Sequence, residues 1–155
     1  MTPEDRLSAL GLSLPSPSAP LANYVPYAIV DGLLFVSGQL ALGADGKIAQ
    51  RHTGKLGKQV FHEAGQEAAR QCAINVLAQA KAALGQLSRI ERCVRLGGFI
   101  NCASEFNALA AVMNGASDLM VQALAEKGRH TRSTIGVAEL PLDSAVEVEA
   151  LFAFT

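Results

Sequence analysis

Residues 128–137 read GRHTRSTIGV, and this stretch says most about the fold and the site. From Arg132 onward the residues alternate, so we predict a strand over 132–138 with Ile135 and Val137 on one face and Arg132 on the other. The neighbours of Arg132 are small, which leaves room for a ligand, and arginine binds carboxylates or phosphates through paired hydrogen bonds. The spacing leaves two alternatives open: a surface ion pair or a ligand clamp.

The segments before and after this stretch show alternating strand and helix patterns. Two apolar runs separated by Asp31-Gly32 predict a hairpin. Residues 62–84 carry one apolar stripe at helical spacing before Gly85 ends the helix. Ser104 is the expected N-cap of a second long helix. We therefore expect strands over 27–30, 33–36, 92–100, 132–138 and 145–154, and helices over 4–10, 62–84 and 104–127.

The order ββαβαββ indicates an α+β fold, with residues 1–22 as an N-terminal helix and arm and residues 23–155 as a single domain. Two helices can cover only one face of such a sheet, so the other face must be solvated or meet a partner. The paired glycines Gly97-Gly98 inside a strand suggest a bulge or a close backbone approach.

Glu147 and Glu149 share the non-core face of the last strand, either as a solvated face or as an acid/base pair. If the last two strands form a hairpin about Pro141, Glu147 lies roughly 13 Å along the sheet from Arg132. A joint site would then need a ligand that spans the gap, another strand pairing, or residues from two subunits.

Composition narrows the function. Only 17% of the residues are charged while 50% are hydrophobic, which favours an oligomer. The net charge of −1 and the lack of any basic stretch disfavour nucleic acid. The three cysteines have no metal-ligand spacing and are expected to be reduced, and no nucleotide or zinc motif occurs. The first residues are acidic, and no apolar run reaches membrane-spanning length, so a cytoplasmic location away from membranes is expected.

Four more polar residues are candidates for the functional site, and each could instead have a purely structural role. Tyr24 and Tyr27 precede or open the first strand and either pack or contact a ligand. His130 stands beside the possible anion site and is either structural or functional. Asn114 begins an Asn-Gly pair in mid-helix, where both residues are poor helix formers, so the pair is either a tolerated irregularity or a functional position.

Several segments together resemble the RidA/YjgF family, formerly described as endoribonuclease L-PSP. They are GLLFVSGQ at 32–39, RSTIGVAELP at 132–141 and VEVEA at 146–150. NGASDL at 114–119 and GRH at 128–130 further resemble a branch distinct from the best-studied deaminases. The resemblance spans about residues 22–154.

The resemblance implies a chorismate-mutase-like fold, in which a mixed sheet carries two helices on one face. It also implies a homotrimer whose three sheets enclose a central barrel, with sites between subunits. Family members hydrolyse reactive enamines and imines, such as 2-aminoacrylate and 2-iminopropanoate, to 2-keto acids and ammonia. One arginine, one carboxylate and backbone donors suffice for this chemistry, so no cofactor is expected.

The residues of the family site fall on particular positions of this chain. The resemblance gives Arg132 the role of clamping the substrate carboxylate and Glu147 that of positioning or activating water. The substrate-binding set is then Tyr24, Ser37, Gly38, Asn114, His130 and Thr134. Thr134 stands where a cysteine is common in the family, so carboxylate binding through its backbone N–H survives but thiol chemistry does not.

Two other functions compete with deamination. One is a non-catalytic trimer that binds or senses small carboxylates, which the residues around His130 and Thr134 motivate. Such proteins are named by homology as endoribonucleases or translation-initiation inhibitors. The other is cleavage of single-stranded RNA, which only the old family description supports and the absent basic patch opposes.

Overall fold

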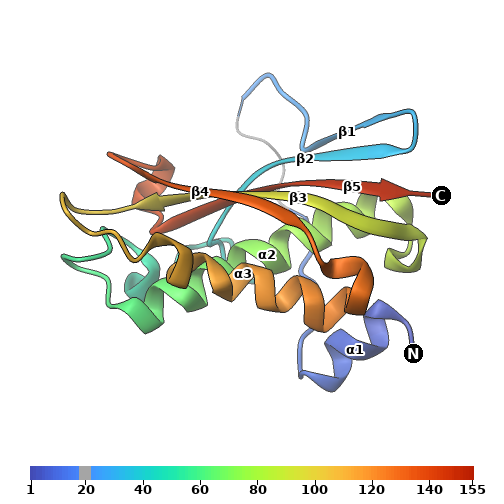
Figure 1. Cartoon of the computed structure of the whole chain (residues 1–155), viewed down its shortest axis with the longest axis horizontal. Helices are drawn as coiled ribbons and strands as arrows, with labels where there is room; N and C mark the ends of the chain where they lie inside the picture. The colour runs from blue at the N-terminus through green and yellow to red at the C-terminus, as the bar shows by residue number, and fades with distance from the viewer. Residues whose placement is uncertain (18–21) are drawn as a thin grey trace.

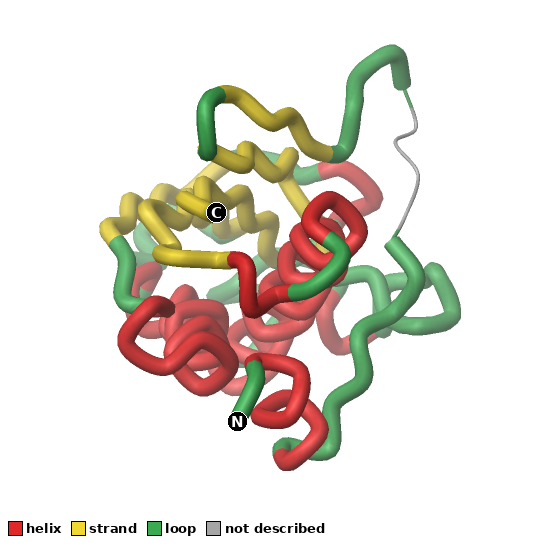
Figure 2. The backbone as a smooth tube through the Cα atoms, turned by 90° about the vertical axis from the view of Figure 1, so that its right-hand side faces the viewer, coloured by secondary structure: helices red, strands yellow, loops and turns green. Residues whose placement is uncertain are grey.

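The core of the fold is a five-stranded sheet in the order β1-β2-β5-β3-β4, seen in a computed structural model that describes residues 1–17 and 22–155. Figure 1 shows α2 and α3 side by side on one face of the sheet, and Figure 2 separates the helical layer from the strands. The elements are α1 (Pro3–Ala9), β1 (Tyr27–Val30), β2 (Leu33–Leu40), α2 (His62–Leu84), β3 (Ile90–Asn101), α3 (Leu109–Leu124), β4 (Thr131–Val137) and β5 (Val146–Phe154). The α+β prediction is confirmed, while part of the expected arm falls on residues 18–21, outside the described residues.

The apolar stripe predicted on α2 is buried along its whole length against the sheet and α3. Its six residues are at most 5% exposed: Ala69, Cys72, Ala73, Val76, Ala80 and Leu84. All three cysteines are free. The Asn-Gly pair in α3 has a packing reason, because a Cβ on Gly115 would overlap the carbonyl oxygen of Gln66 in α2. Gly115 therefore lets the two helices approach each other closely.

The second long helix begins later than the sequence suggested, and the prediction that Ser104 caps it is wrong. α3 starts at Leu109, with Ala108 at the N-cap and no side-chain cap. The chain remains paired beyond β3, since the backbone N–H of Ala103 donates to the carbonyl of Leu56 over 2.9 Å. Because this pairing holds the backbone extended, the helix cannot begin at Ser104.

The last two strands do not form a hairpin. β4 pairs in parallel with β3, and β5 lies antiparallel between β2 and β3. The turn between them is fixed by Asn101 at the end of β3, whose side-chain amide donates to Asp143 Oδ1 over 3.0 Å and to the carbonyl of Ser144 over 3.3 Å. The chain is thereby directed back into the middle of the sheet.

The glycine pair in β3 makes room for side chains. A Cβ on Gly97 would overlap Glu149, and a Cβ on Gly98 would overlap Met113 of α3. The register shifts of β3 lie elsewhere, nearer its start. Gly97-Gly98 therefore marks close approach from both faces of the sheet and is no bulge.

The face of the sheet opposite α2 and α3, here called the open face, is not covered by these helices (Figure 1). Val30, Phe35 and Ile135 are 54%, 46% and 50% exposed there. On the opposite side of the molecule from the open face, α1 packs on the helical layer, and its Leu7 is only 2% exposed. In the described ranges 1–17 and 22–155, no helix combines the length and the apolar character needed to cross a membrane.

Candidate functional site

Arg132 lies on the edge strand β4, and its side chain reaches α3 on the helix-bearing face of the sheet. One terminal nitrogen, Nη1, donates to Asn114 Oδ1 over 2.9 Å and to Ser117 Oγ over 3.0 Å. The other, Nη2, donates to the carbonyl of Ala110 over 3.3 Å. Three acceptors on one side of α3 therefore fix the plane of the guanidinium.

The guanidinium keeps donors for a further partner. Within residues 1–17 and 22–155, Arg132 makes no ion pair, and neither Nε–H nor the second Nη2 hydrogen has an acceptor. Among these residues, Arg132 does not form the ion pair that the sequence left open as an alternative. A half-buried cation with two remaining donors is suited to a carboxylate, which accepts both.

His130 joins the same group of side chains through Ser117. Its Nδ1 lies 2.7 Å from the carbonyl oxygen of Gly128, and its Nε2 lies 2.9 Å from Ser117 Oγ. Ser117 was not among the site residues predicted from the sequence. The available signal was its position three residues after Asn114, which places both residues on one face of the helix.

Thr134 completes this group, because it follows Arg132 by two residues and shares its face of β4. Its hydroxyl oxygen is buried and has no hydrogen-bond partner among the described residues. A buried polar atom without a partner carries a desolvation penalty that a ligand or water could relieve. We call Asn114, Ser117, His130, Arg132 and Thr134 the arginine cluster.

A second group of predicted residues meets on the open face, around Glu147 of β5. The register of β2 against β5 shifts between Val36 and Gln39, so Ser37 and Gly38 together oppose Glu149 in a bulge. A Cβ on Gly38 would overlap the Glu147 carboxylate, so glycine provides the space that the carboxylate occupies. We call Ser37, Gly38, Glu147 and Glu149 the glutamate cluster.

The surroundings of Glu147 in the glutamate cluster oppose its ionisation. Burial raises the pKa of Glu147 above its ordinary value, and the nearby charge of Glu149 raises it further. A carboxylate with a raised pKa exchanges protons more readily near neutral pH, as a general base requires.

The bulge also borders a cavity of about 360 Å³ on the open face. Tyr27, Ser37, Arg95 and Glu149 contribute to its lining. The hydroxyl of Ser37 donates to the carbonyl of Val25 over 2.8 Å, which ties the bulge to the loop before β1. Tyr24 stands in that loop, 54% exposed and outside the lining of this cavity.

Apart from Tyr24, the predicted site residues therefore form two sets that one chain does not bring together. In the sheet register Arg132 is level with Leu96, and Glu147 is level with Phe99. Leu96 faces the helices and Phe99 faces the open side, so Arg132 and Glu147 lie on opposite faces. The strand pairing differs from the predicted hairpin, but it does not by itself bring Arg132 and Glu147 into one site.

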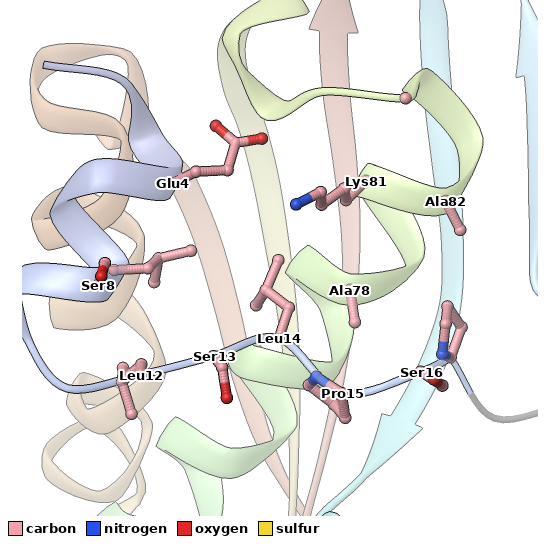
Figure 3. Close-up of a pocket in the computed structure, with 13 residues that line it drawn as sticks. Glu4, Ser8, Leu12, Ser13, Leu14, Pro15, Ser16, Ala78, Lys81 and Ala82 are labelled. Atoms are coloured by element: carbon pink, nitrogen blue, oxygen red, sulfur yellow. The ribbon is translucent and has the colours of Figure 1, made fainter.

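A larger cavity lies away from both clusters, between α2 and the segment that follows α1. Its volume is about 570 Å³, and apolar residues such as Leu12 and Leu14 line it together with Glu4 and Lys81. Figure 3 shows Glu4 and Lys81 pointing toward one another across it. None of the predicted site residues lines this cavity.

Comparison with known proteins shows which family and which solved structures this chain resembles. A family model described as "YjgF/chorismate_mutase-like, putative endoribonuclease" matches residues 4–154. Protein TCP17 of Trypanosoma cruzi is 45% identical over 146 residues, covering 94% of this chain and 89% of TCP17. The structure of Atu1372 from Agrobacterium tumefaciens, described as of unknown function, matches with a TM-score of 0.91 at 45% identity and covers 99% and 92% of the two chains. A Shewanella oneidensis protein with the same endoribonuclease description has a TM-score of 0.95 at 38% identity, covering 99% and 100%.

More distant structures share the fold. RidA from an Antarctic Psychrobacter has a TM-score of 0.62 at 24% identity and covers 90% of this chain and 94% of its own. Escherichia coli TdcF, solved with bound serine, has a TM-score of 0.66 at 23% identity with the same coverage. At this level of identity the likeness concerns the arrangement of helices and strands.

Proposed function

The chain belongs to the YjgF/chorismate mutase-like family, as the RidA/YjgF resemblance indicated, and from this premise we propose that it hydrolyses small 2-imino acids to 2-keto acids and ammonia. The observation that carries the proposal is Arg132: a guanidinium fixed by α3, without an ion pair among the described residues, and with two donors left over. TdcF was solved with serine, a small molecule that bears a carboxylate, and this is the ligand class we propose.

The proposed reaction needs little from the protein beyond placement. Arg132 holds the substrate carboxylate, and Glu147 takes a proton from water as the oxygen bonds to the imine carbon. Glu147 passes this proton to the imine nitrogen, which gives a tetrahedral adduct with one hydroxyl and one amino group. The hydroxyl proton then moves to the amino nitrogen as the carbon–nitrogen bond breaks, so that ammonia leaves and the keto group forms. The raised pKa of Glu147 supports its role as the proton carrier.

Assembly joins the two clusters in this proposal. Within one chain Arg132 and Glu147 lie on opposite faces of the sheet, so the arginine cluster of one subunit would meet the glutamate cluster of its neighbour. The uncovered apolar face with Phe35 and Ile135 supports burial against other copies. We propose a homotrimer with three such shared sites.

The test is keto-acid release from 2-iminopropanoate generated in situ by an amino-acid oxidase. Arg132→Ala should lower kcat/KM by about 100-fold, because charge-assisted hydrogen bonds to the carboxylate are lost. Arg129→Ala is the matched control, since Arg129 is exposed and pairs with Glu126 over 3.1 Å. Wild-type protein that leaves the spontaneous rate unchanged would contradict the proposal.

One observation favours a second candidate, carboxylate binding without turnover. The arginine cluster is complete within a single chain, whereas the glutamate cluster lies on the other face. This candidate would be favoured over the deaminase if 2-oxobutanoate binds in a way that depends on Arg132 while imines hydrolyse no faster with the protein than without it.

A further inference from the structure

We propose that His130 positions Arg132 through Ser117 and does not itself contact the ligand. The inference rests on the proposed function in one respect: Arg132 is taken as the carboxylate-binding group. Its basis is a continuous chain of short contacts, 2.7 Å from Gly128 O to His130 Nδ1, 2.9 Å from His130 Nε2 to Ser117 Oγ, and 3.0 Å from Ser117 Oγ to Arg132 Nη1.

The direction of each hydrogen bond follows from what the atoms can do. A backbone carbonyl only accepts, so the Gly128 carbonyl requires a proton on His130 Nδ1. In the neutral imidazole Nε2 is then bare and accepts the hydroxyl proton of Ser117. Because that proton points at His130, a lone pair of Ser117 Oγ is left facing the Arg132 guanidinium.

The histidine matters because a serine hydroxyl in mid-helix has a competing partner. Serine in a helix readily donates to the carbonyl four residues earlier, which here is that of Met113. His130 supplies a stronger acceptor on the other side and holds the hydroxyl away from that alternative. Ser117 then keeps its lone pair on Arg132, and Nη1 retains both of its acceptors, Asn114 and Ser117.

The same geometry argues against ligand contact by His130. Both ring nitrogens are already engaged, Nδ1 by Gly128 and Nε2 by Ser117. Arg132 and Thr134, in contrast, keep polar atoms without protein partners among the described residues. His130 thus supports Arg132 from the side away from the ligand, while Arg132 keeps donors for the ligand.

A double-mutant cycle on 2-oxobutanoate affinity, measured by calorimetry, tests this arrangement. His130→Phe keeps a ring but no acceptor and should weaken binding about fivefold, the effect of one hydrogen bond. Ser117→Ala should weaken binding about fivefold to tenfold, and the double variant should be no worse than Ser117→Ala. His130→Gln returns an acceptor and should recover part of the affinity. Ser88→Ala, at an exposed serine outside the cluster, is the matched control.

Independent losses that multiply in the double variant would overturn the proposal, because His130 would then act on the ligand directly. Unchanged affinity in His130→Phe would overturn it too. Melting temperatures are compared in parallel, and if His130→Phe does not fold, the comparison of His130→Gln with wild type decides.

Nuclear magnetic resonance separates this inference from the proposed function. In ligand-free wild type, ¹⁵N shifts should show His130 protonated at Nδ1 and bare at Nε2, and the guanidinium signals of Arg132 should show hindered rotation. His130→Phe should release that rotation. If wild type binds no carboxylate, the proposed function fails, while the same spectra still decide whether His130 holds Arg132. Identical Arg132 signals in both proteins would refute the positioning role.

Discussion

Glycines set the distances between neighbouring groups in this protein, and two of them do so in different ways. At Gly115 the opposing atom is the backbone carbonyl of Gln66, which cannot move without shifting α2. At Gly38 the opposing atoms belong to the end of the Glu147 side chain, which can rotate away. The same substitution therefore has different consequences at the two positions.

Gly115→Ala should lower the free energy of unfolding by about 2–3 kcal/mol, because overpacking forces two helix backbones apart. Helix propensity alone predicts the opposite sign, a gain of about 1 kcal/mol. Urea denaturation gives the sign directly. Gly38→Ala is the control, with an expected loss of about 1 kcal/mol or less. If the Gly115→Ala protein were more stable than wild type, the close approach of α2 and α3 would contribute no packing energy.

Glu147 should make stability depend on pH. Its pKa is raised in the folded chain by burial and by Glu149, so the folded state favours the protonated form. The stabilisation is complete below the ordinary value of 4.5 and is lost as pH rises through the raised pKa. Glu147→Gln should therefore become more stable relative to wild type between pH 4 and pH 7.

Denaturation curves at the two pH values measure this difference, and Glu149→Gln should show a smaller effect of the same sign. Glu105→Gln, in an exposed turn, serves as the control. A Glu147→Gln protein whose stability tracks that of wild type at both pH values would contradict the cause assigned to the shift.

The sequence identified most of one cluster and could not place the other relative to it. Arg132, Asn114 and His130 were recognisable as candidates from their residue types and family-like spacing, and the structure brings them together. Ser117 was not recognised, because a serine in mid-helix carries no signal until its partners are known. Arg132 and Glu147 lie on opposite faces of the sheet because of how the strands pair, and local sequence does not encode strand pairing.

Among the secondary-structure elements, periodicity predicted the helices and strands well where one face is buried. The apolar stripe of α2 gave both of its ends correctly, His62 and Leu84. The start of α3 was predicted too early because a nonlocal hydrogen bond between Ala103 and Leu56 competes with helix formation. The position of β5 between β2 and β3 is likewise determined by contacts between residues that are distant in the sequence.

The short helix α1 is attached by one buried leucine and by polar contacts, since Arg6 Nη1 donates to the carbonyl of Ala123 over 3.3 Å and the N–H of Leu87 donates to Glu4 Oε1 over 2.8 Å. A capping box between Thr2 and Asp5 begins it, and Leu7 inserts its side chain into the core. Leu7→Ala should lower the free energy of unfolding by about 2–3 kcal/mol through the cavity it leaves. Leu10→Ala, at a residue that is 42% exposed, should change it by about 0.5 kcal/mol or less. Chemical denaturation of both variants measures the contrast, and equal losses would contradict the anchoring role of Leu7.

For the whole molecule, the separation of the two clusters gives a sharp test of shared sites. Arg132→Ala and Glu147→Gln proteins should each lose most of their activity when assayed alone. If each site takes Arg132 from one subunit and Glu147 from another, mixed assemblies should regain about a quarter of the sites under random exchange. Deaminase activity after unfolding and refolding the two variants together, against each refolded alone, measures the recovery. A mixture as inactive as its components would place both residues in one chain or remove one from the reaction.

The central position of β5 also governs when the chain can fold. Residues 146–154 follow the other four strands of the sheet in the chain, yet they join β2 to β3. Until they emerge, the nascent protein has a hairpin and a separate strand pair with no shared sheet. Formation of the whole sheet must therefore wait for residues 146–154, and a stop codon before Val146 would leave the β1-β2 hairpin and the β3-β4 pair unjoined.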